Sequence, residues 1–192
     1  MLPPFFRPQA WNRTHVWIRE GSVLALALVL AAAGCRRSET VKVQQTDEEG
    51  PRMASVVHTG DPQSDTQLVT GFYAIEQNSW RWTAQKFSVV LRPPAGAAER
   101  GATLNMQLSV PDAVISRLKT VSLSGSIGAT QLSPETYTQQ GPYVFTRDIP
   151  ASLLNAEALR IDFKLDKSLP PGTGGDQREL GVIVSSVGLE AK

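Results

Sequence analysis

The chain has 192 residues, a nearly balanced charge of 19 Lys and Arg against 18 Asp and Glu, and a single cysteine. A surface without a large excess of positive charge lacks the electrostatic footprint that dominates nucleic-acid affinity, so we expect no nucleic-acid partner. One cysteine also excludes an intramolecular disulfide.

Residues 1–34 have the order of a secretory signal. Three arginines and one glutamate precede an uninterrupted apolar run from Val23 to Ala33, which ends in small residues. As a helix, the roughly 11 residues of this run would span about 16 Å, well short of the ~30 Å hydrocarbon core of a bilayer. We therefore expect a targeting segment and no transmembrane helix. Without this segment the chain carries 16 basic and 17 acidic residues.

The stretch from Leu30 to Cys35 resembles the lipobox of bacterial lipoproteins, in which small residues precede an acylated cysteine. It departs from that pattern at Ala32, where leucine is preferred. The resemblance implies that Cys35 carries diacylglyceryl and palmitate chains, becomes the new N-terminus and anchors the protein to a bacterial membrane. Arg36 resembles lipoproteins sent to the outer membrane, on its periplasmic side. An ordinary signal peptide, cleaved after Ala33 or Gly34 to leave a free thiol, is the alternative.

Residues 35–66, beginning at the lipidated cysteine, are expected to form a flexible tether. They are rich in Ser, Thr, Gln, Asp and Glu and show no sustained apolar periodicity. Such a segment buries too little apolar surface to offset the entropy of ordering it. A competing interpretation makes Ala54 to Val57 a short edge strand docked on the domain.

Residues 67–192 are expected to form an all-β domain, because apolar and polar residues alternate with period two in several places. The clearest strands are 103–110 and 159–166, in which every second residue is apolar. Shorter runs predict strands at 68–75, 87–91, 120–124, 143–148 and 181–189. Residues 150–155 are the only helix-like piece.

Turn-forming residues separate these strands at 93–96, 124–125, 140–142 and 170–172. About seven or eight strands without an alternation of strands and helices predict an antiparallel β-sandwich of the jelly-roll type.

A family resemblance spans Leu68 to Glu190. The stretch Gly71-Phe72-Tyr73-Ala74-Ile75-Glu76, then Trp80-Arg81-Trp82-Thr83 and the late Arg178-Glu179-Leu180-Gly181, is similar to signatures of jelly-roll accessory domains in bacterial envelope and glycosyltransferase-linked proteins. Such domains look like galactose-binding-type sandwiches. The resemblance implies a non-catalytic module associated with sugars.

The same stretches supply the candidate ligand-binding residues. On a strand, Trp80 and Trp82 share a face and Arg81 points away, so flat aromatic rings beside charged donors could bind a sugar ring. The pattern favours the other interpretation, in which Trp82 belongs to the core, Trp80 lies at its rim and Arg81 is a structural strut paired with Glu76 or Glu179. The full candidate set is Tyr73, Glu76, Trp80, Arg81, Trp82, Arg178 and Glu179.

We expect no enzyme, metal or cofactor. His15 lies in the signal segment and His58 in the expected tether, so the predicted domain has no histidine or cysteine for triads, thiol nucleophiles or common zinc sites. A calcium site at Asp162, Asp166 and Asp176 is an open alternative. The leading interpretation is a membrane-anchored envelope lipoprotein that binds carbohydrate or envelope polysaccharide. The alternative is a structural or assembly lipoprotein that binds another envelope protein and no small ligand.

Overall fold

The computed structural model of this chain describes residues 53–192. The expected signal segment, Cys35 and residues 36–52 of the expected tether lie outside this part. The described residues contain no helix long and apolar enough to cross a membrane. The strands are β1 (Val56–His58), β2 (Leu68–Glu76), β3 (Trp80–Leu91), β4 (Ala102–Val110), β5 (Val121–Ile127), β6 (Thr130–Tyr137), β7 (Gly141–Ile149), β8 (Leu159–Leu165) and β9 (Ile183–Ala191). The short helices are η1 (Pro62–Thr66), α1 (Ala97–Arg100), α2 (Asp112–Leu118), η2 (Ala151–Leu153) and η3 (Thr173–Gly175).

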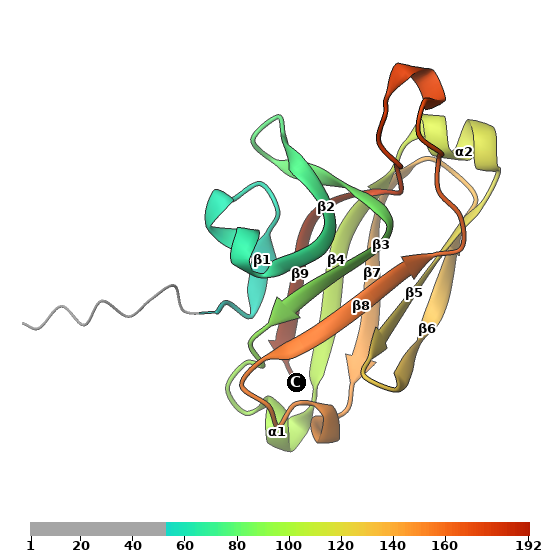
Figure 1. Cartoon of the computed structure of the whole chain (residues 1–192). Coiled ribbons are helices and arrows are strands. Elements are labelled where there is room, and N and C mark those ends of the chain that lie inside the picture. Colours follow the sequence, from blue (N-terminus) through green and yellow to red (C-terminus); the bar gives the residue numbers. More distant parts are fainter. Residues whose placement is uncertain (1–52) are drawn as a thin grey trace, which may run out of the picture. The chain divides into compact units, whose positions relative to one another are not determined.

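The strands form an antiparallel β-sandwich, as predicted. Hydrogen-bonded neighbours follow the order β6-β5-β8-β3-β9-β4-β7, and every pairing is antiparallel. In Figure 1, β3 and β8 pass in front of β9, β4 and β7, which form the layer behind them. The expected alternation is clearest in β4 and β8, where every second residue is buried.

Three phenylalanines join the two layers at the centre of the core. The ring of Phe87 on β3 stacks on that of Phe163 on β8, with centroids 5.1 Å apart. Phe145 on β7, in the opposite layer, meets Phe163 edge to face at 6.2 Å. All three side chains are buried, and aromatic pairs at these distances add to the stabilisation from burial alone.

Strand β3 belongs to both layers. Its second half pairs with β8 from Lys86 to Leu91, whereas Arg81 and Trp82 pair with β9. Strand β2 follows β3 through the change of layer, with register shifts on either side of Phe72. Irregularities of this kind bend a strand and increase its local twist.

The expected boundary between tether and domain at residue 67 is wrong for residues 56–66, and the alternative of a short edge strand describes this region better. Strand β1 pairs with β9 from Val56 to His58, and Val57 is buried in the core. Thr59 is fully buried and its hydroxyl donates to the carbonyl of Val184 at 2.6 Å. Composition suggested a tether because Val56 and Val57 are the only aliphatic residues of this segment.

Other departures from the prediction also have local causes. Strand β6 was not predicted, because its eight residues bury only Leu132 and Tyr137 and include a proline. The predicted turn at Ser124-Gly125 is wrong: both residues lie inside β5, and the chain turns at Gly128 instead. Gly125 serves packing, since a Cβ there would lie 3.1 Å from Leu132 Cδ1. Helix α2, with Val114 as its buried anchor, was also missed.

Gly71 allows β2 to follow the bend of β3. Its φ of +75° lies in the left-handed region, and a Cβ at this position would be 2.0 Å from the carbonyl oxygen of Lys86. No rotation of a side chain can relieve an overlap with backbone, so only glycine fits here.

We predict that Gly71→Ala lowers the free energy of unfolding by more than about 3 kcal/mol, because it adds a backbone overlap to the cost of positive φ. Gly128→Ala is the matched control, since its φ is +55° and a Cβ there meets nothing within 4 Å. The control should cost about 1 kcal/mol. Denaturant unfolding of both variants measures the difference, and equal losses would show that the close approach has no role.

Candidate functional site

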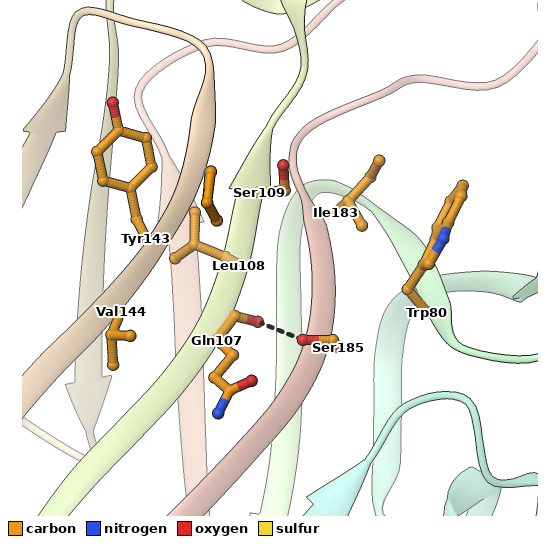
Figure 2. A pocket seen from close by; sticks show the side chains of 9 residues that line it. Trp80, Gln107, Leu108, Ser109, Tyr143, Val144, Ile183 and Ser185 are labelled. Atoms are coloured by element: carbon orange, nitrogen blue, oxygen red, sulfur yellow. Dashed lines mark hydrogen bonds between the residues drawn. The ribbon is translucent and has the colours of Figure 1, made fainter.

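A groove of about 770 Å³ lies on the outer face of the layer formed by the first half of β3 with β9, β4 and β7. This volume lies in the range of small-molecule sites in proteins. Figure 2 shows its wall, with Trp80 and Ile183 toward one end and Tyr143 and Val144 toward the other. The lining residues are Trp80, Gln107, Leu108, Ser109, Pro142, Tyr143, Val144, Ile183 and Ser185.

Strand register places apolar and polar side chains in alternating positions across this face. Ser109 on β4 stands opposite both Pro142 on β7 and Ile183 on β9. Because residues directly opposite in a ladder share a face, these three form one row across the three strands. In the neighbouring row of side chains on this face, Val144 stands opposite Gln107, and 54% of the surface of Val144 is exposed. The groove floor therefore alternates apolar contacts with hydrogen-bonding groups.

An irregularity in β9 adds a hydroxyl to the groove. Gln107 pairs with Ser186 and Leu108 with Val184, so Ser185 has no opposite residue in the ladder. Its hydroxyl donates to the carbonyl of Gln107 across 3.4 Å, a long contact (Figure 2). The side-chain amide of Gln107 is exposed and makes no hydrogen bond with other residues of 53–192. The Gln107 amide can both donate to and accept from a ligand, and the Ser185 oxygen can still accept a hydrogen bond.

Trp80 and Trp82 lie on the same face of β3, as the alternation predicted. Their rings meet edge to face with centroids 6.5 Å apart. Trp80 is half-buried and borders the groove, whereas Trp82 packs against the hydrophobic core. Of the two indoles, Trp80 is the one placed to contact a ligand in this groove.

Tyr73, Glu76 and Arg178 are brought together beside Trp80, which is the partner of Glu76 in the β2–β3 hairpin. The Arg178 guanidinium donates to Glu76 at 2.8 Å and lies 5.2 Å from the centroid of the Tyr73 ring. It also donates to Asp176 at 2.8 Å. This cluster ties the hairpin to the loop that precedes β9.

The ion pairs set the direction of two pKa shifts. Hydrogen bonds from Arg178 lower the pKa of Asp176, and the bonds to Asp176 and then Glu76 raise the pKa of Arg178 despite its partial burial. All three side chains stay about one-third exposed, so solvent screens the pairs. The Arg178 guanidinium thus pairs with two carboxylates, those of Asp176 and Glu76.

Arg81 is a strut, and its predicted partners are wrong. The residue is only 7% exposed; its Nε donates to the Thr59 carbonyl at 2.7 Å. One terminal nitrogen donates to the Tyr73 carbonyl at 3.2 Å, and the other pairs with Asp65. Arg81 therefore ties β3 to η1 and β1. The expected partners Glu76 and Glu179 are bonded elsewhere.

Glu179 lies apart from the groove lining. Its carboxylate accepts a hydrogen bond from the Ser168 hydroxyl at 2.8 Å and a longer one from the backbone amide of Gln85 at 3.3 Å.

The three carboxylates of the possible calcium site each have a different partner. Asp162 pairs with Arg160, Asp166 accepts from the backbone amide of Ser122, and Asp176 pairs with Arg178. No cluster of three or more His, Cys, Asp or Glu side chains suited to a metal occurs in residues 53–192.

Of the predicted candidate residues, Trp80 lines the groove, and the other lining residues were not among the candidates. Gln107 and Ser109 were predicted to face water on their strand, and they do. What joins them to Trp80 is the placement of β9 between β3 and β4, a pairing between segments far apart in the chain. Alternation within one strand carries no signal for that pairing.

Tyr137 carries a buried hydroxyl outside the groove. Its oxygen has no hydrogen-bond partner among residues 53–192, and burial raises the pKa of this phenol. Its ring packs on Tyr143 with centroids 4.6 Å apart. Tyr137 thus packs against Tyr143, which lines the groove.

Comparison with known proteins identifies no family. No protein-family model matches the chain, and no curated protein matches it significantly. Among solved structures, a chain described as "CBM4 structure and function" aligns with a TM-score of 0.34 and 13% identity, covering 76% of this chain and 90% of that one. Similarity at this level does not carry a function from one chain to the other. The resemblance to jelly-roll accessory domains remains a prediction.

We predict that Arg81→Ala lowers the free energy of unfolding by about 3 kcal/mol, because it leaves two carbonyl groups without their donor and opens space in a packed region. Asp65→Asn should cost about 1 kcal/mol or less, since the Asp65 side chain is 61% exposed. Thermal or denaturant unfolding measures both. A neutral effect of Arg81→Ala would contradict the strut.

Proposed function

We propose that this chain is a non-catalytic lipoprotein of the bacterial envelope whose β-sandwich binds carbohydrate in the groove beside Trp80. The observation that carries the proposal is a half-buried indole, Trp80, on one open sheet face with two polar groups: the Gln107 side-chain amide, which bonds no other residue of 53–192, and the Ser185 hydroxyl, which makes only a long 3.4 Å contact.

The chemistry of a sugar ring matches this arrangement. A pyranose has faces of C–H groups and a rim of hydroxyls, so it needs a flat apolar surface and hydrogen-bonding groups at its edge. Trp80 and Ile183 supply the apolar surface at one end of the groove. Gln107 supplies both a donor and an acceptor, and Ser185 supplies a hydroxyl. These few polar groups would orient the ring.

A binding role fits this groove better than catalysis. Its lining contains no acid, histidine or cysteine. Glu76, the carboxylate opposite Trp80 in the hairpin, accepts a hydrogen bond from Arg178 at 2.8 Å. Glycoside hydrolysis needs two carboxyl groups facing the scissile bond. The groove presents hydroxyl groups, a side-chain amide and apolar surface to a ligand.

We predict that Trp80→Ala weakens binding of envelope glycans at least ten-fold, because it removes the stacking surface and leaves the polar groups in place. A glycan array of envelope polysaccharide fragments identifies the sugar, and calorimetry with the full-length protein gives the affinity. Val69→Ala is the control, since Val69 is 42% exposed on β2 and does not line the groove. Trp80→Phe should retain part of the affinity.

The competing function is assembly with another envelope protein. The observation that favours it is Val144 on β7, a large apolar side chain that is exposed. A protein partner that co-purifies stoichiometrically after mild crosslinking, and that stays bound in excess free sugar, would favour this function. Absence of binding to every envelope sugar at millimolar concentration would count equally against the carbohydrate proposal.

The membrane anchor in this proposal rests on Cys35, which follows the apolar run of the signal segment. Two or more acyl chains, at about 0.8 kcal/mol per buried CH₂, would hold the protein on a membrane without a spanning helix. Arg36 favours the outer membrane, with the domain on the periplasmic side.

We predict that mass spectrometry of the natively expressed protein finds a mature N-terminus at Cys35 with diacylglyceryl and acyl modification. Cys35→Ser should release the protein from the membrane fraction into the soluble fraction, because the attachment point is lost. Arg36→Ser is the matched control and should leave the protein in a membrane fraction. An unmodified thiol at Cys35 in the native protein would overturn the anchor.

A further inference from the structure

A second groove of about 450 Å³ lies on the outer face of the other layer, over β3, β8 and β5. We call this surface the lysine face and define it by Lys86, Ser124, Ser126, Arg160, Asp162 and Lys164. The lysines alternate along their strands with buried Phe87 and Phe163, so they point away from the core.

Strand register sets two lysines directly opposite each other. Lys86 on β3 pairs with Lys164 on β8, and Ser124 on β5 stands opposite Lys164 on the other side. Residues directly opposite in a ladder have Cβ atoms about 4.5–5.5 Å apart. The two ammonium groups therefore belong to one small area of the surface, with a hydroxyl at its border.

The charge of this area is not balanced by neighbouring acids. Neither Lys86 nor Lys164 forms an ion pair within residues 53–192. Asp162, the acid of the lysine face, pairs with Arg160 at 2.9 Å. Arg160 also donates to the Ser88 hydroxyl at 3.2 Å, which fixes its position. The face carries a net positive charge in a protein that is nearly neutral overall.

Like charges placed directly opposite in a ladder destabilise a sheet. An oxyanion between the two lysines would turn this repulsion into two charge-assisted hydrogen bonds. The hydroxyls of Ser124 and Ser126 at the same groove would then meet neighbouring hydroxyls of a ligand.

We infer that the lysine face binds the carboxylate or phosphate groups of an acidic polysaccharide. This site lies on the opposite layer from the Trp80 groove and is separate from the proposed sugar-stacking function. A glycan fits the face better than a lipid surface, because its lining is polar or charged apart from Gly125 and the buried rings of Phe87 and Phe163. The exposed large apolar residues, Val56, Val69 and Val144, do not line it.

The test measures binding of two acidic probes, trigalacturonate and a phosphomannan fragment, to the full-length protein by calorimetry at low salt. At least one acidic probe should bind, and neutral maltotriose should bind at this face at least ten-fold more weakly. The affinity for the acidic probe should fall as the salt concentration rises. Lys86→Gln combined with Lys164→Gln should weaken the acidic probe at least ten-fold. Arg117→Gln combined with Lys119→Gln removes the same charge from exposed positions outside the face and should change affinity less than two-fold.

Thermal unfolding supplies a readout that does not depend on the choice of probe. Without ligand, either single lysine variant should raise Tm by about 1–3 °C, because repulsion is relieved. With a bound acidic probe the wild type should have the higher Tm, since it binds the probe more tightly and is stabilised more by it.

Three results would overturn the inference. These are no binding of either acidic probe at millimolar concentration, equal losses in the two double variants, and tighter binding to phosphatidylglycerol vesicles or inorganic phosphate than to the acidic probes. Loss of acidic-probe binding in Trp80→Ala without loss in the lysine double variant would instead assign these probes to the Trp80 groove, so failure of the stacking site and failure of the lysine face can be told apart.

Discussion

The passage of β3 from one layer to the other is the constraint on which the remaining structure depends. Its second half pairs with β8 and contributes Phe87 to the core, while its first half pairs with β9 and places Trp80 on the outer face of the opposite layer. The bend requires the backbone of β2 to touch that of β3 at Gly71. A single strand thus links the centre of the core to the edge of the Trp80 groove, and the indole is held by the same pairing that closes the sandwich.

Two arginines near this bend have different roles because they are buried to different extents. Arg81 is nearly inaccessible and uses its guanidinium to satisfy the carbonyls of Thr59 and Tyr73. Its removal would leave buried acceptors unpaired, which costs more than an exposed ion pair contributes. Arg178 is about one-third exposed and joins two carboxylates in reach of solvent. The first arginine is part of the framework, and the second fastens a loop to it.

Much of the fold could be predicted from alternation, and less of the site. The patterns at 103–110 and 159–166 identified β4 and β8 because both strands bury one face and expose the other. Strand β6 was not predicted because it buries two residues and contains Pro134. Strand β1 was predicted only as the alternative of an edge strand at Ala54 to Val57, because composition does not show its pairing with β9. The shared face of Trp80 and Trp82 followed from local geometry. The partner of Arg81 did not, since ion pairs depend on tertiary placement that spacing within one strand does not determine.

The pairing of β1 with β9 depends on a glycine. Val56 lies over Gly188, where a Cβ would approach Val56 Cγ2 to 2.7 Å, so the first strand of the described fold can lie flat only because its neighbour lacks a side chain. Strand β9 also supplies Ile183 and Ser185 to the groove. A change in how β1 packs on β9 would therefore reach the wall of the groove through the backbone of a single strand.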